Sequence, residues 1–251
     1  MKAMIFAAGL GTRLRPLTNH CPKALAEVGG KPLLQHCIEK LKVAGVESII
    51  VNVHHFADKV EDFLVSNNYF DMLIEISDER EFLLDTGGGL KKAMRFFNDG
   101  KPFLLHNVDV FSNIDLLDFY NFHLQSGAMV SLACNRRESS RYFLFDSAHR
   151  LCGWENVKTA EQKIVVPMQE TFLRLAFGGI HVVNPAIFKL MPATTKFSIV
   201  DFYLHITVEQ LINAYFNDKL QFLDVGKPAQ LAEADLKFKE AKRLNTVKPR
   251  K

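Results

Sequence analysis

The sequence has few cysteines, a single tryptophan and no large excess of charge of either sign. Its 251 residues include four cysteines, 31 lysines and arginines, and 28 aspartates and glutamates, which give a formal net charge of +3. The basic residues cluster only in residues 242–251. Because nucleic-acid-binding domains carry a basic face, this balance predicts no nucleic-acid partner, and we interpret residues 242–251 as a solvated basic tail.

The cysteines also exclude two kinds of scaffold. Cys21, Cys37, Cys134 and Cys152 have neither the close paired spacing of a zinc site nor the density of a disulfide-rich domain. The apolar N-terminal run is short and leads into Gly11 without a small-residue cleavage site, so it predicts a buried strand. No apolar stretch has the length of a membrane span. We therefore expect a cytoplasmic protein with reduced thiols and no membrane partner.

Hydrophobic residues make up 48% of the chain, which is enough for a large core. Short apolar runs with strand character alternate with segments of helical periodicity. The expected strands are residues 3–7, 48–53, 73–77, 102–106 and 129–133, and the expected helices are residues 32–44, 57–65, 90–97 and 115–125. This order predicts an α/β fold, a Rossmann-like three-layer sandwich around a mostly parallel mixed sheet, with ligands at the carboxyl ends of the strands.

The pattern changes after residue 135. Shorter strands are expected at residues 142–145, 163–166 and 175–183, and helices at residues 185–190, 200–213 and 228–241. No linker or repeat interrupts the chain. We predict a single domain over residues 1–241, with one half at about 1–134 and the other at about 135–241.

A glycine loop follows the first expected strand. Its sequence runs Ala-Ala-Gly-Leu-Gly-Thr-Arg over residues 7–13, and Lys23 follows a proline further on. Backbone N–H groups beside glycines can approach phosphate oxygens closely, and Arg13 offers a fork of donors suited to a polyphosphate. Leu14 stands where a dinucleotide fingerprint needs a third glycine, and no Gly-Lys-Ser/Thr of a P-loop is present. For the two glycines alone, an ordinary strand-to-helix turn remains the alternative.

Further motifs lie at the ends of other elements. Gly87 and Gly88 belong to a glycine run that we interpret as a tight turn before a helix at Leu90. Asp109 follows the apolar residues 103–105, and Asp224 follows an apolar pair just before the last helix. A buried carboxylate is costly without compensation, so the two predict a cation. Taken separately, each aspartate could instead cap a helix or a turn.

Together these segments closely resemble the signature of the sugar-phosphate nucleotidylyltransferase family. The resemblance implies an enzyme that joins a nucleoside triphosphate to a sugar 1-phosphate and releases pyrophosphate, with one half for the nucleotide and the other for the sugar. The implied nucleotide-binding residues are Ala8, Gly9, Gly11, Thr12, Arg13, Lys23, Gly87 and Gly88. The resemblance also implies Asp109 and Asp224 as ligands of a magnesium ion (Mg2+), Arg13, Lys23 and Asp109 as catalytic residues, and Asn107, Gly179 and Asp201 as sugar-binding residues.

The sequence departs from the family pattern at Val108, where glycine is usual. Valine needs a negative φ and adds bulk, which bears on the geometry of Asn107. A non-catalytic subunit that senses nucleotide sugars is therefore an alternative, although Arg13, Lys23 and both aspartates are retained. A cytidylyltransferase that uses the same fold on another alcohol or acid is a second alternative.

The choice of substrate rests on the resemblance to short family members. The triple glycine, and the absence of a Glu-Lys-Pro segment where residues 164–167 stand, favour UTP with N-acetylmuramate 1-phosphate. GTP with mannose 1-phosphate is the alternative. We expect a monomer or a homodimer.

Overall fold

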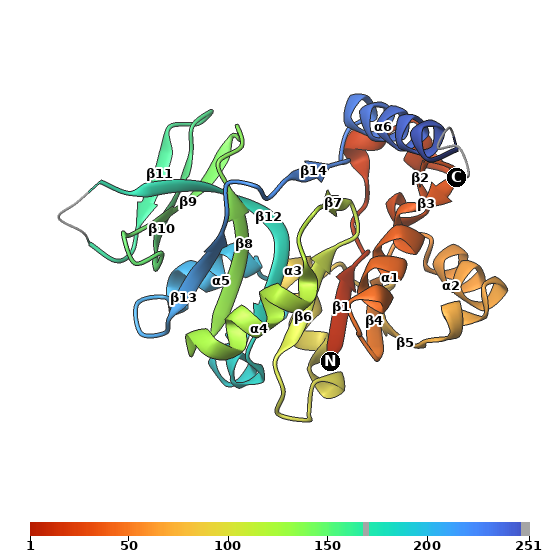
Figure 1. Cartoon of the computed structure of the whole chain (residues 1–251). Coiled ribbons are helices and arrows are strands. Elements are labelled where there is room, and N and C mark those ends of the chain that lie inside the picture. The colour runs from red at the N-terminus through yellow and green to blue at the C-terminus, as the bar shows by residue number, and fades with distance from the viewer. Residues whose placement is uncertain (168–170, 247–251) are drawn as a thin grey trace.

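The computed structural model describes residues 1–167 and 171–246, and their central feature is a large mixed sheet with helices on both faces (Figure 1). In the first half of the chain four strands pair in parallel in the order β5-β4-β1-β6. These strands are β1 (Lys2–Phe6), β4 (Ser48–Val53), β5 (Leu73–Asp78) and β6 (Phe103–Asn107). The register sets Phe6 opposite Asn52 on one side and opposite Asn107 on the other, so three strands end at the same edge.

The second half extends the sheet with mostly antiparallel strands. The long strand β12 (Leu173–Val183) pairs with β6, and it also pairs with β8 (Val130–Asn135) and β9 (Arg141–Phe145). Beyond them lie β10 (Leu151–Asn156) and β11 (Glu161–Ile164), while β13 (Ile212–Phe216) runs parallel to β8. The predicted α/β fold with a mixed, mostly parallel sheet is confirmed, and each antiparallel pair of this sheet includes a strand of the second half.

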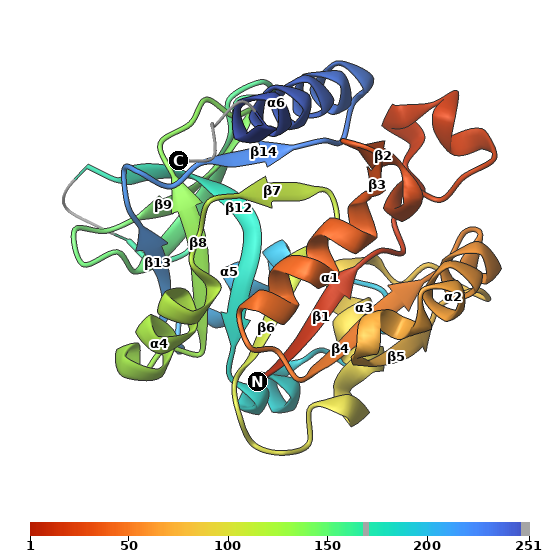
Figure 2. The same cartoon turned by 45° about the vertical axis from the view of Figure 1, so that its right-hand side comes forward.

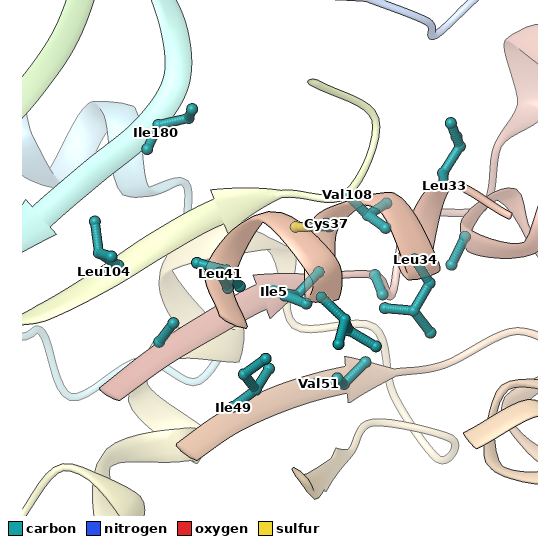
Figure 3. Packing of buried hydrophobic residues seen from close by; sticks show 14 of the residues in the cluster. Ile5, Leu33, Leu34, Cys37, Leu41, Ile49, Val51, Leu104, Val108 and Ile180 are labelled. Carbon is teal, nitrogen blue, oxygen red and sulfur yellow. The ribbon is translucent and has the colours of Figure 1, made fainter. Parts of the chain in front are cut away.

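Alternating side chains divide the core into two layers. On β1, Ala3 and Ile5 point into one cluster and Met4 into the other, as the two-residue period of a strand requires. The first cluster is covered by α1 (Leu33–Val43), α2 (Ala57–Ser66) and α4 (Leu116–Ser126), and Figure 3 shows α1 packed across β1 and β4. The second cluster is covered by α3 (Asp85–Lys92) and α5 (Ile199–Ile206). The sheet is thus the middle of three layers.

Two small sheets complete the fold near the strand ends. One joins β2 (Glu27–Val28) to β3 (Lys31–Pro32), and the other joins β7 (Val110–Ser112) to β14 (Phe222–Asp224). The last helix, α6 (Pro228–Thr246), lies beside β14 and β2 in both views (Figures 1 and 2). The backbone N–H of Gly29 donates to Asp235 on this helix at 2.8 Å. The late chain is thereby attached to the segment that follows the glycine loop.

Several expected elements were wrong in extent. The helix expected at residues 200–213 ends at Ile206, and β13 begins at Ile212, where the chain pairs with β8 instead of continuing as a helix. Strand β10 was not expected. Helix α6 continues to Thr246, so the backbone of residues 242–246 is helical, whereas residues 247–251 of the expected basic tail lie outside the described residues. Within residues 1–167 and 171–246, no helix is both long and apolar enough to cross a membrane.

Candidate active site

The buried side chain of Asn52 fixes the start of the glycine loop where it leaves β1. The N–H groups of Ala7 and Ala8 donate to Asn52 Oδ1 at 2.7 and 3.3 Å. Further along, Gly11 has a φ of 64°, and its carbonyl accepts from Thr18 Oγ1 at 2.8 Å. A Cβ at Gly11 would lie 2.8 Å from Thr18 Cγ2, so this position requires glycine both for its backbone angle and for space. The loop is therefore fixed at both ends.

The same asparagine connects the loop to a buried glutamate. Asn52 Nδ2 donates to Glu79 Oε1 at 2.7 Å, and the N–H of Leu84 donates to Glu79 Oε2 at 3.2 Å. Glu79 is only 1% exposed, and burial raises the pKa of its carboxyl group. Neither Asn52 nor Glu79 belongs to a sequence motif, and neither was predicted as a site residue. The only sequence feature that points to Asn52 and Glu79 is that each is a polar residue at or just beyond the end of a strand.

The glycine run at residues 87–89 lies inside α3, so the expected turn was wrong. These glycines have no positive φ, and the helix starts at Asp85. A Cβ at Gly88 would overlap the carbonyl of Thr195, and one at Gly87 would overlap the ring of Phe197. The N–H groups of Gly87 and Gly88 donate to the carbonyl of Phe197 at 3.0 and 3.3 Å. Glycine is needed here because a segment of the second half lies directly against the helix.

Lys23 and the two aspartates meet beyond the ends of β1 and β6. Lys23 Nζ forms an ion pair with Asp109 Oδ2. The register of β7 with β14 sets Asp224 opposite Val110, and the N–H of Val225 donates to the carbonyl of Asp109 at 2.9 Å. Two aspartates distant in sequence thus lie on neighbouring backbone segments and line the same cavity.

Arg13 reaches the same place from the glycine loop. A Cβ at Gly226 would lie 2.7 Å from Arg13 Nη2 and 2.7 Å from Asp224 Oδ1, so the guanidinium and the carboxylate flank this glycine. Asp224 Oδ1 accepts from the N–H of Gly226 at 2.7 Å. Within the described part of the chain, Asp224 Oδ2 has no hydrogen-bond donor. This oxygen remains available to a ligand.

Two cavities adjoin at these residues. The first cavity has a volume of about 520 Å³, and among its lining residues are Ala8, Gly9, Arg13, Lys23, Asn52, Glu79, Asp109 and Lys196. The second cavity, of about 230 Å³, lies over the second half and includes Arg137, Tyr142, Trp154, Phe177, Gly179 and Phe222. Asn107 and Asp224 line both. A molecule in one cavity would therefore meet a molecule in the other at these two residues.

Val108 is compatible with this arrangement. It has no positive φ, and its side chain is 4% exposed. Figure 3 shows it beside the α1 residues Leu34 and Cys37, with which it shares a buried cluster. On the other side, Gly179 has a φ of 74°, and a Cβ there would lie 2.8 Å from Asn107 Nδ2. Valine thus points into the core, while the glycine of β12 leaves room for Asn107.

The structure brings most of the expected site residues to the cavities, with some exceptions. Gly11, Thr12, Gly87 and Gly88 do not line either cavity and instead shape the loop and helix beside the first. Asp201 is also away from both cavities. Its side chain is 61% exposed and accepts from Lys163 Nζ at 3.0 Å, whereas its neighbour Val200 lines the second cavity. The placement of Asp201 in the sugar site therefore needs correction, because α5 presents the preceding residue inward.

The donor set suits a hard divalent cation that shares its coordination with substrate. Among the described residues no group of three or more His, Cys, Asp or Glu side chains could hold a metal by itself. Mg2+ commonly takes one or two carboxylates and completes its shell with water and phosphate oxygens. Asp109 and Asp224 provide two such carboxylates between the cavities. They fit Mg2+ that binds together with a phosphate-bearing substrate.

A glycine loop with an arginine and a lysine, two aspartates and a second cavity define an α/β protein of the nucleotide-transferring class. Residues 2–241 match the family described as Nucleotidyl transferase. The chain belongs to the nucleotidyl transferase family.

Similar proteins carry two kinds of name. The chain is 50% identical over 109 residues to N-acetylmuramate alpha-1-phosphate uridylyltransferase from Caulobacter vibrioides, covering 43% of this chain and 45% of that protein. It is 31% identical over 232 residues to mannose-1-phosphate guanyltransferase from Schizosaccharomyces pombe, covering 91% of this chain and 61% of that protein. The chain thus spans about half of each curated relative.

Solved structures share the fold. A putative glucose-1-phosphate thymidylyltransferase from Bacillus anthracis has a TM-score of 0.79 at 17% identity, over 96% of each chain. HddC from Yersinia pseudotuberculosis complexed with GMP-PN has a TM-score of 0.73 at 22% identity, over 94% of this chain and 99% of that chain. At these identities the likeness establishes the architecture alone.

Proposed function

We propose that the protein transfers a nucleotidyl group from a nucleoside triphosphate to a sugar 1-phosphate, giving a nucleotide sugar and pyrophosphate. The observation that carries this proposal is the pair of cavities that share Asn107 and Asp224. In the reaction a phosphate oxygen of the sugar 1-phosphate forms a bond to the α-phosphorus. The bond from the α-phosphorus to the bridging oxygen breaks, and pyrophosphate leaves with the electron pair. Family membership supports the same reaction class.

The residues of the first cavity supply alignment and charge neutralisation. We assign the triphosphate to the glycine loop with Ala8 and Gly9, and the leaving pyrophosphate to Arg13, whose fork suits a polyphosphate. Lys23 would hold a phosphate at the reacting centre once its ion pair with Asp109 opens. Mg2+, when bound by Asp109 and Asp224, would neutralise phosphate charge. Two reactants held in adjoining cavities need no covalent nucleophile, because alignment itself removes much of the barrier.

The second cavity is assigned to the sugar. Tyr142, Trp154 and Phe177 give it aromatic walls, and Asn107 and Gly179 form its boundary with the nucleotide. A domain of residues 1–241, with a nucleotide half at about 1–134 and a sugar half at about 135–241, accommodates both substrates. The free state of Cys21, Cys37, Cys134 and Cys152 supports a cytoplasmic location as part of the proposal.

For the particular substrates we propose UTP and N-acetylmuramate 1-phosphate, as in the recycling of cell-wall sugars. The support is the 50% identity to the uridylyltransferase from Caulobacter vibrioides over 109 residues. The longer match to the guanyltransferase from Schizosaccharomyces pombe, 31% over 232 residues, favours GTP and mannose 1-phosphate as the second candidate.

One assay tests both the reaction class and the choice of substrates. Pyrophosphate release is followed with the four common nucleoside triphosphates against N-acetylmuramate, mannose and glucose 1-phosphates, with the unphosphorylated sugars as controls. We expect the highest kcat/KM with UTP and N-acetylmuramate 1-phosphate. A clear preference for GTP and mannose 1-phosphate would replace the substrates and keep the reaction class. No pyrophosphate from any pair would contradict the reaction itself.

A further inference from the structure

Neither arginine that lines the second cavity forms an ion pair with the residues the structure describes. Arg137, Arg141 and Asp224 are the charged residues that line this cavity among those the structure describes. Arg141 is exposed, whereas Arg137 is half-buried between β8 and β9. The single carboxylate, Asp224, already faces Arg13 across Gly226. The cavity therefore carries an excess of positive charge before a substrate enters.

The guanidinium of Arg137 is held in a fixed position. Its Nη2 donates to the carbonyl of Phe177 at 2.8 Å, and its Cζ lies 5.9 Å from the centre of the Phe222 ring. Both phenylalanines line the second cavity. Within residues 1–167 and 171–246, the other guanidinium nitrogens of Arg137 have no hydrogen-bond acceptor. The planar guanidinium of Arg137 thus borders the second cavity with N–H donors that make no hydrogen bond to the described residues.

The position of the Arg137 guanidinium indicates which kind of group it binds. Burial lowers the pKa of Arg137, and the nearby Asp224 carboxylate opposes this, so the arginine stays charged beside the shared boundary of the two cavities. Hydroxyl groups of a sugar would leave much of this charge uncompensated. A phosphate offers several anionic oxygens, which a guanidinium binds through two parallel hydrogen bonds.

We infer that Arg137 binds the phosphate group of the sugar 1-phosphate and thereby positions it for attack. The inference rests on the proposed function. It adds a residue outside every motif that the sequence analysis singled out, and it assigns Arg137 to the phosphate rather than to a carboxylate carried on the sugar ring.

The chain offers a matched control next to Arg137. Arg136 is exposed, lies over the ring of Phe216 at 5.0 Å and is 3.9 Å from Asp218. It lines neither cavity. Arg136→Ala removes an arginine from the same segment without changing either cavity wall, so it controls for local destabilisation.

The experiment compares wild type, Arg137→Ala, Arg137→Lys and Arg136→Ala by steady-state kinetics, and by calorimetric binding of sugar 1-phosphates and of the same sugars without phosphate. N-acetylmuramate 1-phosphate is compared with glucose 1-phosphate, which has no carboxylate. We expect Arg137→Ala to raise KM for both sugar 1-phosphates roughly tenfold or more, since a charge-assisted pair is lost. KM for the triphosphate and the affinity for unphosphorylated sugar should stay near wild type. Arg137→Lys should recover part of the loss, and Arg136→Ala should match wild type.

Four results would overturn the inference. An unchanged KM in Arg137→Ala, with an active wild type, would refute it and leave the proposed function standing. A loss confined to N-acetylmuramate 1-phosphate would assign Arg137 to the sugar carboxylate. An equal loss for the unphosphorylated sugar and the triphosphate, with a lower unfolding temperature in both Arg137 variants, would give the residue a purely structural role. A wild type without activity toward any sugar 1-phosphate would refute the function and the inference together.

Discussion

Lys23 and Asp109 form an ion pair in the wall of the first cavity, with only 13% and 11% of their side chains exposed. Each charge is removed from water and depends on the other for compensation. An incoming phosphate offers Lys23 a second anionic partner, and a divalent cation offers the same to Asp109. In the proposed reaction the pair is therefore a resting arrangement, and its two members would have separate partners once substrate is bound.

Asp224→Asn should lower kcat by at least two orders of magnitude while the unfolding temperature stays near that of wild type. The physical reason is that Asp224 would contribute ligand charge at the boundary of both cavities, and it forms no ion pair with the residues that the structure describes. Pyrophosphate release and a thermal melt measure the two effects. Asp85→Asn is the control, because Asp85 lines the first cavity only and is exposed. Activity within a few fold of wild type would remove Asp224 from the proposed metal site.

Asp109→Asn should reduce activity to a similar degree and also destabilise the fold. It leaves Lys23 buried without a counter-charge, which typically costs about 3–5 kcal/mol for a fully buried pair. The slight exposure of both side chains places the expected loss at or below the lower end of that range. Urea unfolding measures it, and Lys23→Met combined with Asp109→Asn should regain stability without regaining activity. A double variant no more stable than Asp109→Asn would contradict this account.

Removing divalent metal should abolish turnover. Two carboxylates and a triphosphate at one boundary repel one another unless a cation is present. Excess EDTA should stop pyrophosphate release, and added Mg2+ should restore it. The unfolding temperature of the substrate-free protein should change little, because Lys23 already compensates Asp109. Full activity in EDTA would mean that the protein's own cations suffice.

Gly88→Ala should destabilise the protein, although alanine is favoured over glycine inside a helix by about 1 kcal/mol. The new methyl group would overlap the carbonyl of Thr195, so α3 or the facing segment must move. KM for the triphosphate should rise with it, because α3 borders the first cavity. Lys92→Ala, an exposed position in the same helix, should leave stability within about 0.5 kcal/mol of wild type. A stabilised Gly88→Ala protein would refute the close contact.

Acid should destabilise the fold through buried histidines. His123 is 3% exposed and burial lowers its pKa from 6.5 to about 4. Because its folded pKa lies below its unfolded pKa, the unfolded state binds more protons as pH falls from 6.5 toward 4, and stability decreases over that window. The contribution of this one residue is on the order of 3 kcal/mol between the two plateaus.

His123→Asn provides the measurement. His123 Nδ1 lies 2.9 Å from Ser131 Oγ, which itself donates to Asn213 Oδ1 at 2.7 Å, so the histidine nitrogen is the donor. Asparagine keeps a donor there but does not titrate. The variant should lose less stability than wild type between pH 6.5 and pH 4 in urea unfolding. Parallel pH profiles would show that His123 is not responsible.

The sequence predicted the regular part of the fold well. The first strands and helices follow a simple period, and residues such as Leu34 and Cys37 recur at helical spacing on one buried face. The helix expected at residues 200–213 included the first two residues of β13, because the apolar run there is too short to show where a helix ends and a strand begins. The glycines at 87–89 were taken for a turn because sequence alone does not reveal that Thr195 lies against them.

The candidate site likewise contains some residues that the sequence predicts and others that only the structure reveals. Arg13, Lys23, Asp109 and Asp224 belong to motifs with fixed spacing, and the structure brings all four to one cavity. Asn52, Glu79 and Arg137 belong to no motif. Strand pairing and tertiary contacts bring Asn52 and Glu79 together in the first cavity and place Arg137 in the wall of the second. Asp201 matched a pattern, yet the rotation of α5 points it toward Lys163. The spacing of a motif thus predicts the site residues that a loop contributes. The residues that helix orientation and strand order bring to the site can be identified only from the fold.

The pairing of β7 with β14 also fixes when the site can exist during protein synthesis. Asp109 precedes β7 directly, whereas Asp224 belongs to the strand that pairs with β7 and is synthesised much later. Synthesis proceeds from the N-terminus, so the strands of the parallel sheet and the glycine loop are made before β14. A nascent chain therefore carries its first carboxylate long before the second, and the two can come together only after β14 has emerged.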